Sequence, residues 1–545
     1  MYLEETVAQK AVEQTGFGKF NLKVTAVSAF IYLNCAFSIT SVGFVIPTAA
    51  CDFQMTTIDK GRINAAPMLG MVVGSGIWGY MADLKGRKIS LLISLFLQFI
   101  ADALASIVPS YWALVFFKFL SGIGVTGQLS IVFTYLGEFQ PTKYRHRILS
   151  WMELSWAIGV IVVALFAWAI IPLTFEYKGD FFQMSSWNLF VLMSSLPALI
   201  AGIWLITLPE TPKYLAENGE REIMLKVLMR MFVENTGKTP DQFKEKLSSC
   251  TIPSISDLVN QTEETENERT KKVVLTKKEK LKELLNSSKI QARTLIQKPY
   301  AKRLITTSSI MFCMTSTYYS LMTWFPELFQ RFATFEKTFP EEFASVCTVS
   351  QRLAASNNSL HEELFQIEQL SDPFGCDSQM DTSVYVNSAL LGAACIPFAI
   401  LLPLTVNRLG YRIYLLFTAT IACATTIAFF FVKTSTQNLV LSCIFEAFTS
   451  LNISVIFCVL VDLFPTNLRV MATAITLFVG RVGSLFGNML FAYLIDDYCT
   501  VLIIVMAAQL FLASVLCWAT PSRNKMRKIQ GFPSKKIKNK AFNPS

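Results

Sequence analysis

The segment GYMADLKGRK (residues 79–88) is a short charged turn between two apolar stretches, and its pattern occurs a second time in the chain. Asp83–Lys88 aligns with Asn407–Arg412. The same shift along the chain superposes another element, acid-x-x-Pro-x-x-x-Arg, which follows the turn at equal spacing in each half. The members of this element are Glu138, Pro141 and Arg145 in the first copy and Asp462, Pro465 and Arg469 in the second. Two blocks that share one shift indicate that the chain consists of two related halves.

The stretches around these turns are apolar enough to span a membrane. Of the 545 residues, 52% are hydrophobic and 16% are charged, whereas soluble domains have about 25% charged residues. A spanning helix needs about 20 mostly apolar residues, and we count twelve such segments. Because lipid offers no partners for backbone polar groups, each is predicted to be a helix and none a strand. The predicted spans are residues 25–48, 61–81, 89–108, 112–136, 149–172, 187–208, 303–325, 384–404, 413–432, 437–462, 469–494 and 499–520. We therefore predict an all-α membrane protein with twelve transmembrane helices in two six-helix, pseudo-symmetric halves.

Charge predicts the orientation, since basic loops stay in the cytoplasm. The loops after the second, fourth and eighth spans are basic, and the alternate loops are acidic. Both termini are therefore expected in the cytoplasm of a plasma-membrane or vesicle-membrane protein. The basic tail is expected to face anionic lipid rather than nucleic acid, because no aromatic residues are interleaved for base stacking. The expected parts are an N-terminus (1–24), a first half (25–208), a cytoplasmic linker (209–302), a second half (303–520) with a non-cytoplasmic loop (327–383), and the tail (521–545).

The composition argues against an enzyme or a metal protein. The two histidines, His146 and His361, are predicted on opposite sides of the membrane, and the twelve cysteines are scattered. The linker contains no glycine-rich phosphate-binding loop, so ATP-driven pumping is not expected. It should instead contain short helices near 220–235, 241–248 and 278–295. We expect no catalytic residues, no cofactor and no metal.

The segment 79–88 resembles the signature loop of the major facilitator superfamily. KFLSGIG (118–124) resembles the fourth-helix motif of that superfamily, with Lys118 where Arg is usual. Other stretches resemble one branch, the synaptic vesicle glycoprotein 2 and related transporter-like proteins, over roughly residues 14–525. These stretches are GFGKF (16–20), SGIGVTGQLSIVFTYLGEFQP (121–141), LSWMELSWAIGV (149–160), FAWAIIP (166–172), LPETPKYLAENG (208–219) and YYSLMTWFPEL (318–328).

The resemblance implies that charges at the cytoplasmic helix ends form a latch between the halves in the outward-open state. Gly86 permits the tight turn between the second and third helices, and the basic pair after it can bind an acid or a helix C-terminus. The alternative is that these charges fix only topology and loop geometry. The second copy should be weaker, since Asn407 and Tyr411 replace Asp and Arg. The candidate latch residues are Asp83, Gly86, Arg87, Lys88, Glu138, Arg145, Asp462 and Arg469.

Ionisable residues inside the spans are candidates for function, because burying a charge in a membrane is costly. Glu446 and Arg481 lie about 14 and 18 Å into their helices. They are candidates for a substrate or coupling site, and the alternative is a buried structural ion pair. Lys118 is a further candidate. Asp102 and Glu153 lie near helix ends, where their side chains can reach the interface.

Aromatic residues in the matching stretches can line a central cavity. Trp156 and Tyr319 could stack on an organic solute or cation, and the alternative is helix packing or an interfacial belt. The related glycoproteins have an acidic pair in the first helix, where this chain has Cys35 and Ser38. No proton-coupling carboxylate is therefore assigned to the first span.

The loop 327–383 is too short for the large luminal segment of the related glycoproteins. It contains Cys347 and Cys376, which are predicted to form a disulfide that closes about 30 residues and contributes roughly 3–4 kcal/mol. Two free thiols are the alternative. Asn357 lies in an Asn-Asn-Ser sequon and is the candidate glycosylation site.

The resulting hypothesis is a transporter that moves a small organic solute, which includes organic ions, by alternating access. A coupling ion is left open, and the other partner is membrane lipid, with no nucleic acid; the protein is expected to be monomeric. The alternative is a vesicle protein with a regulatory or scaffolding role and no net transport.

Overall fold

The structure is a computed structural model that describes residues 2–178, 183–248, 289–339, 345–352, 380–409, 411–464 and 466–520. Within these ranges it is almost entirely helical, and twelve long helices form its body. The N-half contains α2 (Lys19–Ala49), α3 (Thr57–Lys85), α4 (Arg87–Ala105), α5 (Tyr111–Phe139), α6 (Thr142–Ile170) and α7 (Ser186–Ile206). The C-half contains α13 (Tyr300–Thr338), α15 (Thr382–Leu409), α16 (Tyr411–Ala428), α17 (Ser435–Leu463), α18 (Thr466–Leu494) and α19 (Cys499–Ala519). The predicted twelve-helix fold is confirmed, and each predicted span coincides with one of these helices.

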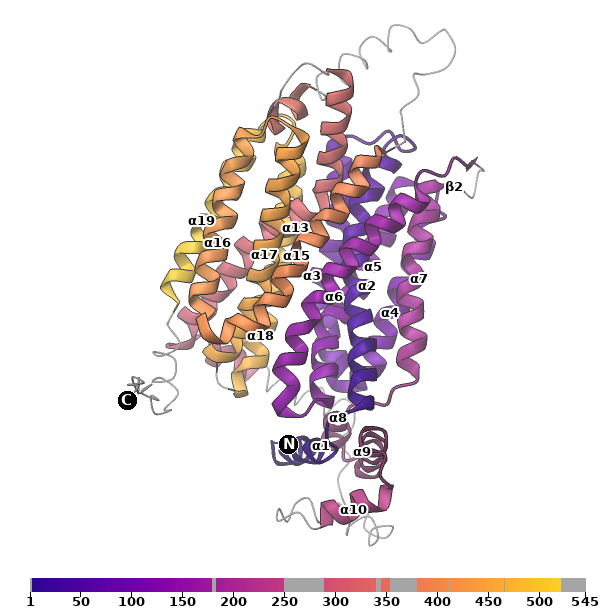
Figure 1. The fold of residues 1–545 in the computed structure, drawn as a ribbon, viewed down its shortest axis with the longest axis vertical. Coiled ribbons are helices and arrows are strands. Elements are labelled where there is room, and N and C mark those ends of the chain that lie inside the picture. Colours follow the sequence, from indigo (N-terminus) through magenta and orange to yellow (C-terminus); the bar gives the residue numbers. More distant parts are fainter. Residues whose placement is uncertain are drawn as a thin grey trace, which may run out of the picture.

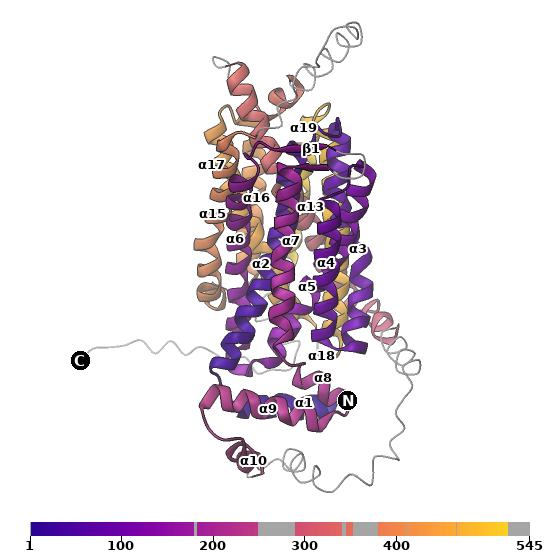
Figure 2. The ribbon, with the colours of Figure 1, turned by 90° about the vertical axis from the view of Figure 1, so that its right-hand side faces the viewer.

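The two halves lie side by side as two helical bundles (Figure 1). The most extensive packing between them is made by three helix pairs: α2 with α13, α3 with α18, and α6 with α15. The short helices around the linker lie beyond one end of the bundles, which we call the linker side. The opposite end, with β1 and β2, is called the distal side (Figures 1 and 2). A pathway between the halves would therefore run from one of these sides to the other.

Ten of the twelve long helices are apolar enough to cross a membrane by composition alone, and α13 and α17 complete the bundle. Buried Ser and Thr residues lower the hydropathy of α13. Their cost is small because the hydroxyls donate to carbonyls one turn earlier, as Thr315 does to Met311 O at 2.7 Å and Ser320 to Ser316 O at 2.6 Å. The polar face of α13 can thus lie inside the bundle.

The helix α13 continues beyond the predicted end of its span at Phe325, through Pro326 to Thr338. The sequence interpretation placed the residues from 327 onward in a loop. A proline inside a membrane helix is tolerated where neighbouring groups compensate for the lost hydrogen bond. The charges Glu327 and Arg331 therefore lie on a rigid helix.

Four short helices cover the linker side: α1 (Tyr2–Gln14), α8 (Pro212–Glu217), α9 (Arg221–Thr236) and α10 (Pro240–Ser248). The helices α9 and α10 match the expected segments 220–235 and 241–248. Residues 289–295 are helical, and the earlier part of the expected 278–295 helix lies outside the described residues. The helices α1 and α8 were not predicted, because short polar sequences carry little periodic signal. Figure 2 shows α1 and α9 lying across the end of the N-half.

The prediction that Cys347 forms a disulfide with Cys376 is wrong. That cysteine is bonded to Cys499 at the start of α19, 152 residues later in the sequence. The Cα atoms of the pair are 5.3 Å apart, because the residues after α13 pass close to the distal end of α19. Proximity in the sequence therefore indicated the wrong partner for Cys347. Cys376 and Asn357 lie outside the described residues.

The distal side also holds a short hairpin of β1 (Glu176–Lys178) and β2 (Gln183–Ser185), which leads into α7. It lies between two spans, so the prediction of no strand within a span holds for the described residues.

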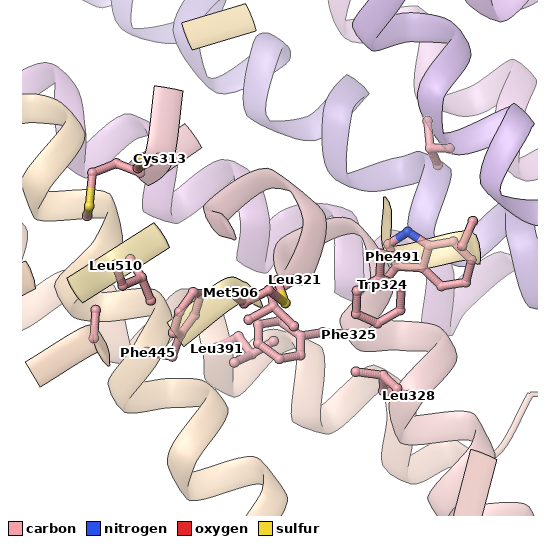
Figure 3. Close-up of a cluster of buried hydrophobic side chains, with 14 of the residues drawn as sticks. Cys313, Leu321, Trp324, Phe325, Leu328, Leu391, Phe445, Phe491, Met506 and Leu510 are labelled. Atoms are coloured by element: carbon pink, nitrogen blue, oxygen red, sulfur yellow. The ribbon is translucent and has the colours of Figure 1, made fainter. Parts of the chain in front are cut away.

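The C-half is packed around aromatic side chains of its central helices (Figure 3). Trp324 of α13 stacks on Phe491 of α18 with ring centroids 4.8 Å apart. One position later, Phe325 meets the edge of Phe445 of α17 at 6.4 Å. Consecutive residues of α13 thus contact two different helices. Aromatic pairs of this kind stabilise a protein by about 0.5–1.5 kcal/mol beyond the contribution of their buried area.

Candidate functional site

Arg87, the first residue of α4, is buried among three carboxylates on the linker side. Its guanidinium nitrogens lie 3.4 Å from Glu138 Oε1, 3.6 Å from Glu217 Oε2 and 3.7 Å from Asp83 Oδ1. The guanidinium carbon also lies 5.3 Å from the ring centroid of Tyr214. The structure thus brings together three of the predicted latch residues. Glu217, from the linker helix α8, joins them and was not identified from the sequence.

The turn before α4 requires glycine. Gly86 has φ +99°, and a Cβ there would lie 2.3 Å from Oε2 of Glu210. The Glu210 carboxylate accepts backbone N–H bonds from Arg87 at 3.1 Å and Lys88 at 3.0 Å, which satisfies the start of the helix. Burial raises the pKa of Glu210 above its usual range, although the N–H bonds from Thr211 and Lys88 and the charge of Arg87 oppose the rise. Lys88 Nζ donates to Ile206 O at the end of α7, at 2.9 Å.

The described contacts of Arg145 stay within the N-half and α1, and little is described of the second copy. Arg145 Nε donates to Gly137 O at 2.8 Å, and its Nη2 donates to Gln9 Oε1 of α1. In the second copy, Arg469 lies near the start of α18, and its Nε has no hydrogen-bond partner among the described residues. Nothing is described of the Asp462 side chain.

The described latch contacts therefore stay within the N-half and its linker-side helices. Hydrogen bonds that cross between the halves lie at the distal side and at mid-depth instead. In the described part of the chain, these bonds are Lys60–Glu327, Arg331–Thr57, Asn64–Thr323, Trp156–Tyr318 and Arg481–Ser130. No described contact of the latch residues reaches the other half, and the role of the latch stays a prediction.

At mid-depth, Glu446 of α17 is buried at the boundary between the halves. Its carboxylate lies close enough to the Tyr318 hydroxyl of α13 to interact with it electrostatically. That hydroxyl in turn accepts a bond from Nε1 of Trp156 of α6, at 3.1 Å. The chain of contacts links a charged group of the C-half to an aromatic residue of the N-half.

A small cavity lies beside Glu446 and is lined by both halves. Thr40 and Val160 contribute from the N-half, and Met322 and Ser388 from the C-half. One carboxylate oxygen, Oε2, has no hydrogen-bond partner in the described residues. A buried polar atom without a partner is costly, which makes this oxygen a candidate for binding a proton or a water molecule.

Arg481 of α18 points across to the N-half, where its Nη2 donates to Ser130 Oγ of α5 at 3.0 Å. Its Nη1 is buried and has no hydrogen-bond partner among the described residues. Within that part of the chain, no ion pair joins Arg481 to Glu446, which rules out the structural-pair alternative for this conformation. Arg481 contacts the other half, whereas Glu446 lies beside Tyr318 of its own half.

Lys118 forms an ion pair with a residue of its own half. Its Nζ lies 2.9 Å from Asp102 Oδ1, and Ser121 Oγ donates to Asp102 Oδ2 at 2.8 Å. Lys118 and Asp102 are 3% exposed, so the pair is shielded from water. This geometry favours a structural role for Lys118 over direct contact with a solute.

Trp156 and Tyr319, the two aromatic residues predicted to line a cavity, lie in one cluster with Tyr32 and Tyr318. The Trp156 ring lies 5.3 Å from that of Tyr32, and the rings of Tyr318 and Tyr319 are 5.0 Å apart. The Tyr319 hydroxyl is within electrostatic range of Arg481 and of Glu153. Glu153 is therefore near the centre of the protein, although the sequence placed it near a helix end.

A buried amide cluster in the N-half was missed by the sequence interpretation. Asn34 Nδ2 donates to Gln98 Oε1 and to Gln128 Oε1, both at 2.9 Å, and Gln128 Nε2 donates to Gln98 Oε1 at 2.7 Å. Cys35 Sγ lies 3.4 Å from the same Gln128 oxygen. A search for uncharged amides within the spans, in addition to charges, would have found this cluster.

Comparisons with known families agree with this architecture. Residues 23–339 match the family described as "Sugar (and other) transporter", and residues 370–543 match "Major Facilitator Superfamily". Synaptic vesicle glycoprotein 2A of Rattus norvegicus is 30% identical over 341 residues, which are 61% of this chain and 45% of the relative. Synaptic vesicle glycoprotein 2C of Homo sapiens is 32% identical over 262 residues, 44% of this chain and 36% of the relative. The matched region thus spans less than half the length of these relatives, and the predicted resemblance is confirmed.

Solved structures show the same fold. The partially occluded inward-open conformation of the xylose transporter XylE from E. coli matches with a TM-score of 0.62 and 14% identity, over 92% of this chain and 98% of that chain. Its inward-open conformation matches with a TM-score of 0.61 and 15% identity, over 94% and 99%. At this identity the likeness concerns the fold.

Proposed function

The chain belongs to the sugar (and other) transporter family of the major facilitator superfamily, and on that premise we propose that it moves a small organic solute across a membrane by alternating access. The solute would bind between the halves at mid-depth. We also propose that the linker side faces the cytoplasm, because the basic loops lie there.

One observation carries the proposal: two charged side chains, Glu446 and Arg481, lie at the boundary between the halves in the middle of the bundle. The Glu446–Tyr318–Trp156 contacts and the Arg481–Ser130 bond both involve that boundary. The Trp156–Tyr318 and Arg481–Ser130 bonds cross the boundary, so both would change when one half rocks against the other. Charges retained at membrane depth are costly and accompany function in transport pathways.

The residues around this point suggest separate roles. The aromatic rings near Trp156 and Tyr319 supply an apolar wall with polar edges, which suits the organic part of a solute. Arg481 and Glu446 each have a polar atom without a hydrogen-bond partner in the described residues, and these atoms could bind polar groups of a solute. Glu446 is also the candidate coupling group, since it can bind or release a proton as its contact with Tyr318 changes.

The proposal is tested by flux into proteoliposomes that contain the full-length protein, with a panel of neutral, anionic and cationic organic solutes. We expect saturable uptake of at least one class and a pH-dependent rate. A folded Glu446→Gln variant should lose most of that uptake or its pH dependence. Glu222→Gln, on the exposed surface of α9, is the matched control and should behave as wild type.

Two results would contradict the proposal. Wild-type flux with an unchanged pH profile in the folded Glu446→Gln protein would remove Glu446 from the mechanism. Solute binding, measured as a thermal shift, without flux of any bound solute would favour the regulatory or scaffolding alternative. The orientation has a test of its own: a protease site inserted in the 209–302 linker should be cut only from the cytosol.

A further inference from the structure

Four charged residues meet at the distal side, where the first turn of α3 lies against the end of α13. Lys60 Nζ of the N-half is 2.7 Å from Glu327 Oε1 of the C-half. Arg331, one turn after Glu327 on α13, lies 3.1 Å from the same oxygen through its Nε. Its Nη1 is 2.6 Å from Asp496 Oδ1, just after α18. Its Nη2 donates to Thr57 Oγ1 of the N-half at 3.2 Å.

From this geometry we infer that Lys60, Thr57, Glu327 and Arg331 form a distal lock, which holds the halves together on the distal side in the conformation described here. The lock rests on the proposed alternating access, since only a protein whose halves separate needs one. It is made of residues outside the signature turns, and it lies at the opposite end of α3 from Asp83.

Burial makes these contacts stronger than ordinary surface ion pairs. The side chains of Glu327 and Lys60 are 4% and 16% exposed, and that of Arg331 is 11% exposed. Exposed pairs contribute about 0–1 kcal/mol because water and salt screen them. A pair shielded from water is screened much less, so the Lys60–Glu327 contact can bias the balance between two conformations.

The division of charge between the halves makes the lock reversible. The C-half holds Glu327, Arg331 and Asp496 as a resident set with one net negative charge, and the N-half contributes Lys60 and the Thr57 hydroxyl. When the halves part, Glu327 keeps Arg331, and Arg331 keeps Asp496. Only Lys60 loses its charged partner, and it is the most exposed of the charged side chains in the lock, so water can solvate it. Separation therefore leaves no buried charge unpaired. An unpaired buried charge would be the most costly arrangement.

The backbones beneath the lock are also closely apposed. A Cβ added to Gly61 would lie 2.1 Å from the Cβ of Ala492 of α18. One turn deeper, Asn64 Nδ2 donates to Thr323 Oγ1, which donates to Asn488 Oδ1, both at 2.9 Å. The lock thus closes the outer end of a continuous seam between α3, α13 and α18.

The test uses hydrogen exchange of the purified full-length protein, a readout that needs no solute. Lys60→Met removes the charge and keeps the side-chain length. We expect backbone exchange in the distal ends of α3 and α13 to rise about tenfold, because a weaker lock populates the parted state more often. Lys60→Arg should keep wild-type protection. The matched control is Arg62→Met, because Arg62 pairs with Asp59 of its own helix at 2.7 Å and not with the C-half.

Unchanged exchange at both helix ends in the folded Lys60→Met protein would overturn the lock. If that variant does not fold, Thr57→Val serves instead, since it removes the Arg331 contact without removing a charge. It should raise exchange at the same ends by a smaller factor, and wild-type exchange in it would equally refute the lock. The lock and the transport proposal fail separately. A shift in exchange without flux of any solute would reject transport only, and flux with unshifted exchange would reject the lock only.

Discussion

At the scale of single residues, the buried pair of Lys118 and Asp102 allows a structural role of a charge to be distinguished from a role in transport. Both lie inside the N-half, 2.9 Å apart, and Ser121 supplies a further bond to the carboxylate. Removing one partner of a buried pair leaves the other charge uncompensated, at a cost of about 3–5 kcal/mol. Lys118→Met should therefore lower the thermal unfolding temperature of the detergent-solubilised protein by several degrees.

The double variant Asp102→Asn with Lys118→Met gives the decisive comparison. Since both charges are removed, most of the lost stability should return. A Lys118→Met protein with wild-type stability and no flux would instead assign Lys118 to the solute site, and the structural interpretation would be wrong.

Residue types within the spans predicted which charged side chains lie at the boundary between the halves better than they predicted the partners of those side chains. Glu446 and Arg481 were singled out by charge and depth, and both lie at the boundary between the halves. Their opposite signs and similar depths also suggested an ion pair, which the structure does not form. Depth along a helix follows from a rise of about 1.5 Å per residue. The direction in which a side chain points depends on packing against several helices, which one sequence does not specify.

At the scale of elements, α9 docks on the start of α2 through an ion pair that responds to pH. Glu234 Oε2 lies 2.7 Å from Lys23 Nζ, and Arg230 Nε lies 2.9 Å from its Oε1. Partial burial opposes ionisation, but the bonds from Lys23 and Arg230 outweigh it and hold the pKa of Glu234 below its usual range. Its stabilisation is therefore complete above the unfolded pKa of about 4.3 and is lost as pH falls through the lower folded value.

The expected effect is confined to acid conditions and is small. Because the pair is partly exposed, it should contribute about 0.2–1 kcal/mol. Exchange of residues 221–236, corrected for intrinsic rates, should be constant from about pH 8 to 5.5 and should rise below about pH 4. Glu234→Gln should show the higher exchange already at pH 7. A decline in protection between pH 7 and 5.5 that is absent from Glu234→Gln would show that the sign argument is wrong.

Helices were predictable where hydrophobic length decides, and less so where a helix leaves the membrane. All twelve spans were located, because an apolar run of this length has no other stable conformation in lipid. The end of α13 was placed too early, since hydropathy falls after Phe325 and Pro326 suggests a break. The spacing of Glu327 and Arg331, four residues apart, was the available signal that the helix continues. The Cys347–Cys499 bond had no such signal, because it depends on two elements meeting at the distal side.

At the scale of the whole molecule, the two ends of α3 carry charged residues that are expected to stabilise different conformations. Lys60 lies at its distal end in a contact with the C-half, and Asp83 lies at its linker end, beside Arg87 of the N-half. These positions are about 34 Å apart at the rise of an α-helix. If the predicted latch closes the linker side in the other conformation, Asp83 stabilises a state different from the one described here. The two residues would then bias one equilibrium in opposite directions.

Single and double variants test this opposition. Asp83→Asn should leave the unfolding temperature nearly unchanged, because its contact with Arg87 is 3.7 Å long and its side chain is 55% exposed. It should nevertheless lower exchange at the distal end of α3, since the parted distal state becomes rarer. Lys60→Met should raise exchange there, and the double variant should return close to the wild-type value, because effects at distant sites add. Flux should fall in both single variants and recover in part in the double variant. An Asp83→Asn protein with unchanged exchange on both sides and unchanged flux would leave the signature turn with a role in loop geometry alone, and the distal lock would then be the one control of access that α3 carries.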